Sequence, residues 1–241
     1  MRRNSARGGH ARTVAAVAVV LAVALGASAC TGEEKRAEAK GQTPAELLAS
    51  ARTKLETSPS VSFTLESAGL PGKAVGISGA RGTGRFTPPS FKGTLNATIN
   101  GVTGAVDVIA VEQDVFMKFF TPGYNPIDPA DYGAPNPAQL FDTKAGITSL
   151  VDRTQGVEKA ATVRDGADVL ATVKGTLPGE AVADLLVAGD RAATFDVTYG
   201  ITDRGGELRT VVLSGPFYQG ASSTYTLRLK RLDQPVEITR P

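Results

Sequence analysis

The sequence predicts an α+β domain, in which a curved antiparallel sheet wraps around a few short helices. About nine or ten runs of alternating apolar and polar residues predict strands that bury one face. Tight turns at Asn100-Gly101 and Asp165-Gly166 predict hairpins, and hairpins make antiparallel neighbours. Only three or four short helical patterns accompany the strands, so the helices are the only available cover for the apolar face.

The first 29 residues have the pattern of an export signal. Four arginines precede an apolar run from Val14 to Leu25, which is shorter than the roughly twenty residues that span a bilayer. Residues 27–30, Ala-Ser-Ala-Cys, resemble the bacterial lipobox, although Ala27 stands where that motif usually has leucine. In that motif the cysteine is lipidated and becomes the new N-terminus. We therefore predict a lipoprotein signal peptide over residues 1–29.

Cys30 is the single cysteine of the chain and has no partner for a disulfide within it. We expect Cys30 to carry two acyl chains such as palmitate, which meets the two-chain requirement for stable membrane anchoring. This predicts a protein anchored by lipid at the extracytoplasmic face of the plasma membrane. The alternative is an ordinary secretory signal that is cleaved nearby, with Cys30 uninvolved.

Removal of the leader changes the charge balance. The full chain has 26 Lys and Arg against 24 Asp and Glu; without the four leader arginines the counts are 22 and 24, a net charge of about −2. The mature chain has no basic field for nucleic acid. Cys30 and the small, charged residues after it predict a flexible tether over residues 30–42, ahead of one domain over residues 43–241.

The domain is predicted to begin with a helix. Thr43, Pro44 and Glu46 form a capping box with proline in the first turn, and apolar residues at helical spacing continue to about Ser58. Alternation then predicts a first set of strands, with a weaker signal in the glycine-rich stretch 69–84. The clearer strands of this set lie at residues 61–66, 94–100, 102–111 and 115–119.

An irregular segment, Thr121 to Val151, separates two sets of strands. Its five prolines exclude it from a central strand, because proline fixes φ and lacks an N–H donor. Asn136 and Pro137 form a helix start, and apolar residues recur at helical spacing from Ile147. Since irregular segments of this length are usually functional, we predict that it crosses the open side of the sheet and closes a cavity.

The alternating pattern resumes after this segment. A short helix with an apolar stripe is predicted from Pro178 to Leu186. The strands of the second set are predicted at residues 157–164, 167–176, 195–201, 208–214 and 225–230.

The reactive side chains exclude several classes of enzyme. The only histidine, His10, leaves with the leader, so the mature chain has no Ser-His-Asp or Cys-His catalysis and no His- or Cys-based zinc site. Asp128 and Asp131 are an alternative acid and base, but beside Pro129 they fit turn and cap positions better. A calcium site from these two and Asp142 has no recognised spacing. We expect no catalytic residue, no metal and no cofactor.

Several segments together resemble the LppX/LprG (LppX_LprAFG) family of lipoproteins from mycobacteria and other actinobacteria. The likeness covers essentially the whole mature chain. The segments are the lipobox, SPSVSFTLES at residues 58–67, GLPG at 69–72, FKGTLNATINGVTGAVDVIAVEQDVFMKF at 91–119, GYNPIDPADYGAPNPAQLFDTKAGITSLV at 123–151 and YTLRLKRLDQPVEITRP at 225–241.

The resemblance implies a half-barrel sheet that encloses a hydrophobic cavity, similar to the carriers that move lipoproteins across the periplasm. It implies a non-enzymatic protein that binds acylated lipids or glycolipids, including triacylglycerol, and carries or presents them in the cell envelope. It also implies a membrane efflux-type transporter as a partner, and it aligns Leu95 with a cavity-lining valine. Together with strand parity it predicts that the cavity is lined by Phe63, Leu65, Leu95, Ala97, Ile99, Val106, Val108, Met117, Phe119, Leu140, Phe141, Phe195 and Leu227.

Two other interpretations remain open, because alternation alone cannot distinguish a cavity from a packed core. One is an envelope protein-interaction module that assists a transporter without lipid cargo, which predicts a filled core. The other is an enzyme that uses Asp128 and Asp131, which predicts loss of activity when either becomes asparagine.

Overall fold

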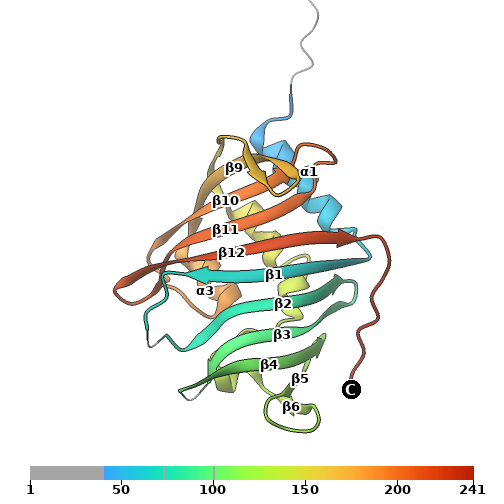
Figure 1. Ribbon diagram of the computed structural model, residues 1–241. Helices are drawn as coiled ribbons and strands as arrows, with labels where there is room; N and C mark the ends of the chain where they lie inside the picture. The colour runs from blue at the N-terminus through green and yellow to red at the C-terminus, as the bar shows by residue number, and fades with distance from the viewer. Residues whose placement is uncertain (1–40, 73, 100) are drawn as a thin grey trace, which may run out of the picture. The chain divides into compact units, whose positions relative to one another are not determined.

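The computed structural model describes residues 41–241, except Lys73, Asn100 and the side chain of Ile99. The predicted signal peptide, Cys30 and residues 31–40 of the tether lie outside the described residues. Residues 41–241 form one compact unit with its own hydrophobic core. An antiparallel sheet carries short helices on one face, which confirms the predicted fold class (Figure 1).

The sheet has twelve strands in the described part of the chain, and every neighbouring pair is antiparallel. Its order is β6-β5-β4-β3-β2-β1-β12-β11-β10-β9-β7, with β8 paired to β9. The first strand therefore pairs with the last and joins two meanders into one sheet. The bounds are β1 (Ser60–Ala68), β2 (Gly76–Phe86), β3 (Pro89–Ile99), β4 (Val102–Val111), β5 (Asp114–Lys118), β6 (Asn125–Ile127), β7 (Gln155–Lys159), β8 (Val163–Asp165), β9 (Asp168–Pro178), β10 (Thr194–Thr202), β11 (Leu208–Tyr218) and β12 (Ala221–Leu232).

The predicted number of strands was too low. β6 has three residues, which is too short to display alternation, and the single strand predicted over residues 157–164 forms two strands, β7 and β8. β6 contains Pro126 and lies at the edge of the sheet, where a missing N–H donor leaves no gap in a central ladder.

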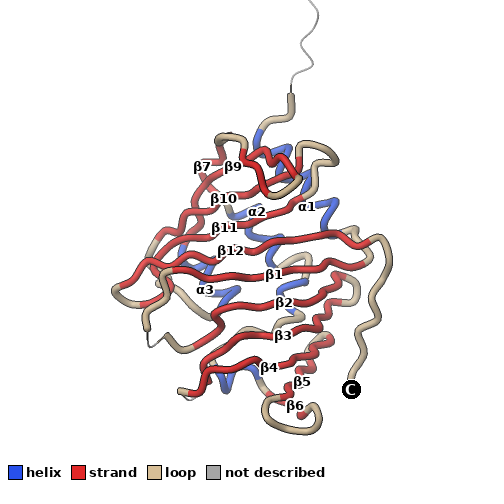
Figure 2. Tube along the Cα trace, in the orientation of Figure 1, coloured by secondary structure: helices blue, strands red, loops and turns tan. Residues whose placement is uncertain are grey.

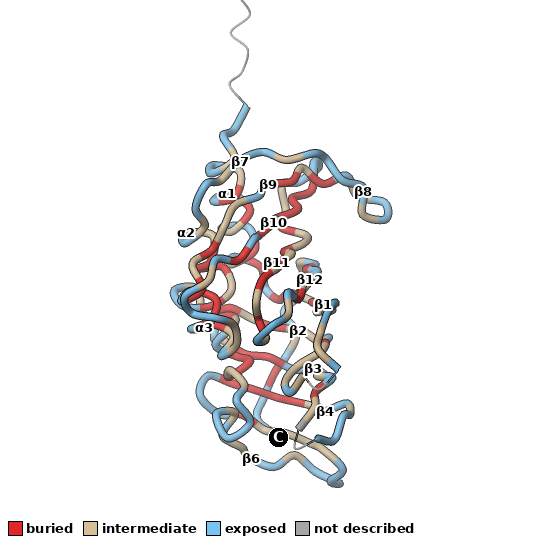
Figure 3. Tube along the Cα trace, turned by 90° about the vertical axis from the view of Figure 1, so that its left-hand side faces the viewer, coloured by how far each residue is buried: buried red, intermediate tan, exposed pale blue. Residues whose placement is uncertain are grey.

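The helices lie on one face of the sheet, as the front and side views agree (Figure 2, Figure 3). They are α1 (Pro44–Glu56), α2 (Leu150–Arg153) and α3 (Gly179–Leu186). The predicted capping box of α1 is present: the Glu46 N–H donates to Thr43 Oγ1 at 3.2 Å, and the Thr43 N–H donates to Glu46 Oε2 at 2.8 Å.

The second half of the irregular segment is less helical than predicted. It contains the short 3₁₀ turns η1 (Pro129–Tyr132), η2 (Gln139–Phe141) and η3 (Ile147–Ser149), followed by the single turn of α2. Asn136 Oδ1 does accept a hydrogen bond from the Ala138 N–H at 2.9 Å, as a cap would. The chain then folds back tightly at Gly146, where a Cβ would overlap backbone oxygens, so no continuous helix forms.

One strand buries residues on both faces, contrary to the prediction of a single apolar face. Val106 and Val108 of β4 face the helices and the irregular segment, whereas Ile109 and Val111 pack against Ile238 of the C-terminal tail. The Val236 N–H donates to Ser60 Oγ at 2.8 Å and helps to hold that tail. The tail therefore covers part of the outer face.

Candidate functional site: two apolar pockets under one sheet

Two pockets lie between the inner face of the sheet and the elements that cover it. The larger pocket, of about 340 Å³, is lined by residues of β1, β2, β11 and β12 on one side and of η2, η3, α2 and α3 on the other. The smaller pocket, of about 60 Å³, is lined by residues of β2 to β6 and covered by residues 129–137. The irregular segment thus contributes to the wall of both pockets.

The side chains that line the larger pocket are almost entirely hydrocarbon. Leu65, Leu213 and Leu227 come from the sheet, and Leu140 and Leu185 come from the cover. Among the described residues that line it, the only side chains with a nitrogen or oxygen atom are the tyrosines at positions 218 and 225. This is the composition expected of a site for an apolar ligand.

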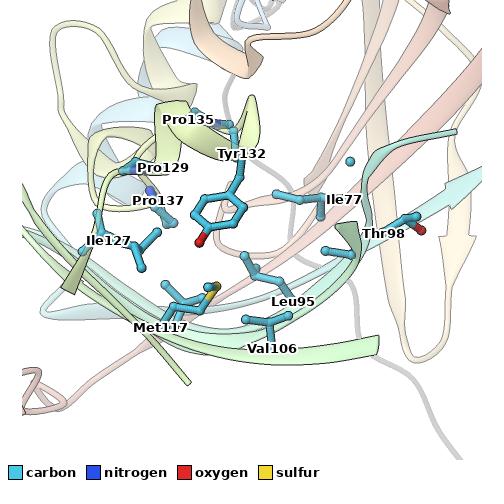
Figure 4. A pocket seen from close by; sticks show the side chains of 15 residues that line it. Ile77, Leu95, Thr98, Val106, Met117, Ile127, Pro129, Tyr132, Pro135 and Pro137 are labelled. Atoms are coloured by element: carbon cyan, nitrogen blue, oxygen red, sulfur yellow. The ribbon is translucent and has the colours of Figure 1, made fainter. Parts of the chain in front are cut away.

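The smaller pocket is nearly filled by its own cover. Figure 4 shows the ring of Tyr132 between Ile127 and Ile77, above Met117 and Leu95. Tyr132 is 37% exposed, so its ring closes the smaller pocket from the solvent side.

Four residues line both pockets: Gly76, Ile77, Ala134 and Pro135. The first two begin β2, and the last two belong to the irregular segment just after η1. We call residues 133–135 the divider. The two pockets are neighbours on one surface, separated where the divider approaches the start of β2.

Eight of the thirteen side chains predicted to line a cavity line one of these pockets. Leu65, Leu140 and Leu227 line the larger pocket, and Leu95, Ala97, Val106, Val108 and Met117 line the smaller one. The side chain of Ile99 lies outside the described part of the structure. Lipid binding by any of these residues stays a prediction.

The four remaining residues are phenylalanines that line neither pocket. Phe141 packs 5.9 Å from Phe63 and 5.5 Å from Phe86 between ring centroids, and a Cβ on Gly84 would overlap its ring. Phe195 is fully buried, and a Cβ on Gly215 would likewise overlap its ring. Phe119 lies 4.3 Å from the exposed ring of Phe120. Phe63, Phe141 and Phe195 are therefore packed core residues in this structure.

Arg52 fastens the second half of the irregular segment to α1. Its Nη2 donates to the Thr143 carbonyl oxygen at 2.9 Å, and its guanidinium pairs with Asp152 and with Glu56. The hydrogen bonds to these carboxylates, Asp152 first, raise the pKa of Arg52 above its ordinary value, so it remains charged. Thr154 adds a second attachment, through its hydroxyl at 2.7 Å from that of buried Tyr199.

Two of the three carboxylates considered for catalysis or calcium binding, those of Asp128 and Asp142, accept hydrogen bonds from backbone N–H groups. Asp128 is the N-cap of η1, and its Oδ1 accepts from the Ala130 N–H at 2.9 Å. Asp142 Oδ1 accepts from two backbone N–H groups at 2.8 Å, while Asp131 is exposed within η1. No group of three or more His, Cys, Asp or Glu residues that could hold a metal ion occurs within the described ranges.

Sequence reasoning missed the two tyrosines of the larger pocket. Tyr225 has the same parity as Leu227 and could have been assigned to the inner face. Tyr218 follows Phe217 directly, and alternation would place these two side chains on opposite faces. The register of β11 and β12 shifts between Gly215 and Tyr218, so both side chains reach the pocket.

No helix within residues 41–241, as far as they are described, is long and apolar enough to cross a bilayer.

Comparison with known proteins gives one family and one fold. The family described as LppX_LprAFG lipoprotein matches residues 43–238. Among curated proteins, no sequence matches the chain. The crystal structure of LprF from Mycobacterium bovis is similar, with a TM-score of 0.68 and 15% identity over 82% of this chain and 96% of that one. LppX from Mycobacterium tuberculosis is also similar, with a TM-score of 0.58 and 18% identity over 80% of this chain and 98% of that one.

Proposed function

The chain belongs to the LppX_LprAFG lipoprotein family, a family of lipid-binding envelope lipoproteins, and we propose that it binds acylated lipids or glycolipids in its larger pocket. It carries or presents these lipids in the cell envelope and performs no chemistry on them. The lipid on Cys30 anchors it to the plasma membrane from the extracytoplasmic side.

The observation that carries this proposal is the composition and volume of the larger pocket. A packed core leaves few voids larger than a water molecule, whereas this pocket has a volume of about 340 Å³ between leucine, isoleucine and phenylalanine side chains. An engineered apolar cavity of about 150 Å³ already binds benzene. A larger apolar cavity with two polar side chains favours a ligand that is mostly hydrocarbon.

The energetics suit a carrier. Each methylene moved out of water is worth about 0.8 kcal/mol, so burial of about a dozen methylenes contributes on the order of 10 kcal/mol. The acyl region of a membrane offers the same methylenes nearly the same free energy. Transfer between membrane and pocket is therefore close to neutral, which allows both loading and unloading.

The volume limits the cargo. About 340 Å³ lies at the lower end of the roughly 300–1,000 Å³ of ligand pockets, which favours a single acyl chain. A lipid with several chains, such as triacylglycerol, requires more space. Movement of the divider away from the start of β2 would join the two pockets and supply part of it.

An efflux-type transporter as a partner follows from the family resemblance and is part of this proposal. A protein-interaction module without cargo is the other candidate. It requires a filled core, and the larger pocket argues against it.

The test is native mass spectrometry of residues 41–241, purified from an actinobacterial host and extracted for lipids. We expect a stoichiometric acylated ligand and uptake of added glycolipid by the delipidated protein. The matched variant is Leu227→Trp, which places an indole in the larger pocket, and its thermal melt shows whether the fold survives. A homogeneous ligand-free mass from several hosts, with no uptake of glycolipid, would contradict the carrier function and favour the protein-interaction module.

A further inference from the structure

The polar atoms of the larger pocket's side chains are concentrated at one point. Tyr218, at the end of β11, and Tyr225, on β12, bring their hydroxyl oxygens to 3.0 Å from each other. The Tyr225 hydroxyl donates to the carbonyl oxygen of Ile77 at 3.2 Å, so in this arrangement the proton shared between the two tyrosines is that of Tyr218. This pair is the one place in the described wall where side chains can distinguish a polar part of a ligand from its hydrocarbon.

The pair can supply one free donor. Each hydroxyl has one proton and can also accept, and Tyr225 lies near two acceptors, the Ile77 carbonyl and the Tyr218 oxygen. When Tyr225 turns its proton from the Ile77 carbonyl oxygen to the Tyr218 oxygen, the proton of Tyr218 is available to a third group. A ligand acceptor beside Tyr218 would select this arrangement.

The surroundings favour a neutral acceptor. No charged side chain is among the described residues that line the larger pocket, so an ionised group would be desolvated without a partner. Burial, together with the hydrogen bond to Tyr218, raises the pKa of Tyr225 above its ordinary value. Tyr225 therefore remains a neutral hydroxyl under physiological conditions.

The pair also lies beside the rim of the pocket. A Cβ on Gly76 would meet the Tyr218 hydroxyl at 3.5 Å, and the neighbouring Val75, which lines the same pocket, is 61% exposed. In an acyl lipid, the ester carbonyl follows directly after the hydrocarbon chain. A chain lying in the pocket would place its carbonyl where the apolar wall gives way to solvent.

We propose that the Tyr218 hydroxyl, supported by Tyr225, donates a hydrogen bond to the ester carbonyl of the bound acyl lipid. Tyr218 is then a specificity-determining residue, and the pocket selects neutral acyl esters over ionised fatty acids. This assignment rests on the proposed function, because it needs an acyl chain in the larger pocket.

The experiment compares two ligands that differ in one carbonyl group, a monoacylglycerol and a 1-O-alkylglycerol of the same chain length. Calorimetry measures their dissociation constants for the wild type, for Tyr218→Phe and for the control Tyr124→Phe, at a side chain that lines neither pocket and packs against the cluster of Ile109, Val111 and Ile238. Tyr218→Phe should weaken the acyl ester roughly threefold to tenfold, the range for one neutral hydrogen bond, and should leave the alkyl ether within about twofold. Tyr124→Phe should change neither.

The outcomes separate this assignment from the carrier function. If Tyr218→Phe weakens both ligands equally, or neither, the carrier function stands and the ester contact is wrong. The same holds if an ionised fatty acid of equal chain length binds as tightly as the ester. If the wild type binds neither glycerol lipid, the carrier function fails and the assignment fails with it. Should Tyr218→Phe melt early, Tyr225→Phe is the second variant, since it removes the supporting hydroxyl and should also weaken only the ester.

Discussion

The larger and the smaller pocket lie on the same face of one sheet, yet they differ in volume, cover and polarity. The larger pocket, of about 340 Å³, is covered by short helices and contains a pair of hydroxyl groups. The smaller one, of about 60 Å³, is covered by a proline-rich chain that inserts Tyr132 into it. On the sheet side, both pockets are lined by strands of the same alternating pattern. The cover, more than the sheet, therefore decides where space remains.

The covers also differ in how they are attached. Arg52, Tyr199 and the Phe141 cluster fasten residues 136–154 to α1 and to the sheet. Residues 128–133, which lead into and form the first half of the cover of the smaller pocket, are largely exposed, and the side-chain hydrogen bond among them joins the near neighbours Asp128 and Ala130. We infer that the larger pocket has a fixed cover, whereas the smaller pocket has one that can move. The following predictions test this difference.

The largest expected effect comes from filling each pocket in turn. Leu227→Trp should displace about four methylenes of a bound chain, each worth about 0.8 kcal/mol, and so weaken lipid binding roughly 100-fold. Leu95→Trp fills only the smaller pocket and should weaken a single-chain ligand by less than about threefold. Titration of both variants with a monoacylglycerol gives their dissociation constants and therefore the ratio of the two losses in affinity. Equal losses would mean that the two pockets act as one site.

Gly84→Ala should detach the fixed cover from the half of the sheet that carries the smaller pocket. The added Cβ would overlap the Phe141 ring, and overpacking of this kind costs about 1–3 kcal/mol of unfolding free energy. Urea denaturation measures the loss. Gly72→Ala, which meets nothing within 4 Å, is the matched control. An unchanged midpoint for Gly84→Ala would show that Phe141 can move at little cost.

The same glycine shows what the sequence could and could not predict. Alternation correctly gives the inner face at Phe63, Leu95 and Leu227, because period two is a local property of a strand. Whether an inner side chain fills the core or lines a pocket depends on a distant partner. Phe141 is a core residue because Gly84, 57 positions earlier, leaves room for its ring.

Irregularities in the sheet explain the rest of the site. The shift of register after Gly215 reverses the parity of Tyr218; Gly215 and Pro216 could have signalled a bulge there, but they do not show which side chains it turns inward. Burial of Ile109 and Val111 likewise depends on a tail more than a hundred residues away in the chain. The fold class follows from repeated local patterns, whereas the pocket follows from a few long-range contacts.

Arg52→Ala should release part of the fixed cover. The substitution removes charged hydrogen bonds to Asp152, Glu56 and the Thr143 carbonyl oxygen. We expect it to lower the free energy of unfolding by about 1–2 kcal/mol. The rate of lipid release, measured by stopped-flow fluorescence, should rise because residues of the cover can leave the pocket. Arg191→Ala removes an exposed pair with Asp184 on α3 and should change stability by at most about 0.5 kcal/mol. If both variants release lipid at the wild-type rate, this attachment does not control the cover.

Tyr199→Phe should have the smallest effect near neutral pH and a distinct signature in alkali. The Tyr199 hydroxyl lies 2.7 Å from the Thr154 hydroxyl, which itself donates to the Leu150 carbonyl oxygen. Removing the Tyr199 hydroxyl should therefore lower the free energy of unfolding by about 1 kcal/mol. Burial raises the pKa of Tyr199 to about 12, above the value of about 10 in the unfolded chain. The folded state therefore retains a proton that the unfolded state loses, so this contribution is fully present below pH 10 and is lost as the pH rises towards 12.

The variant lacks this titration, and its unfolding free energy should fall less steeply than that of the wild type between pH 10 and pH 12. Denaturant titrations at intervals across this range measure both slopes. Parallel curves for wild type and Tyr199→Phe would mean that the cover opens and admits solvent to Tyr199 before the protein unfolds. The cover of the larger pocket would then be as movable as that of the smaller one.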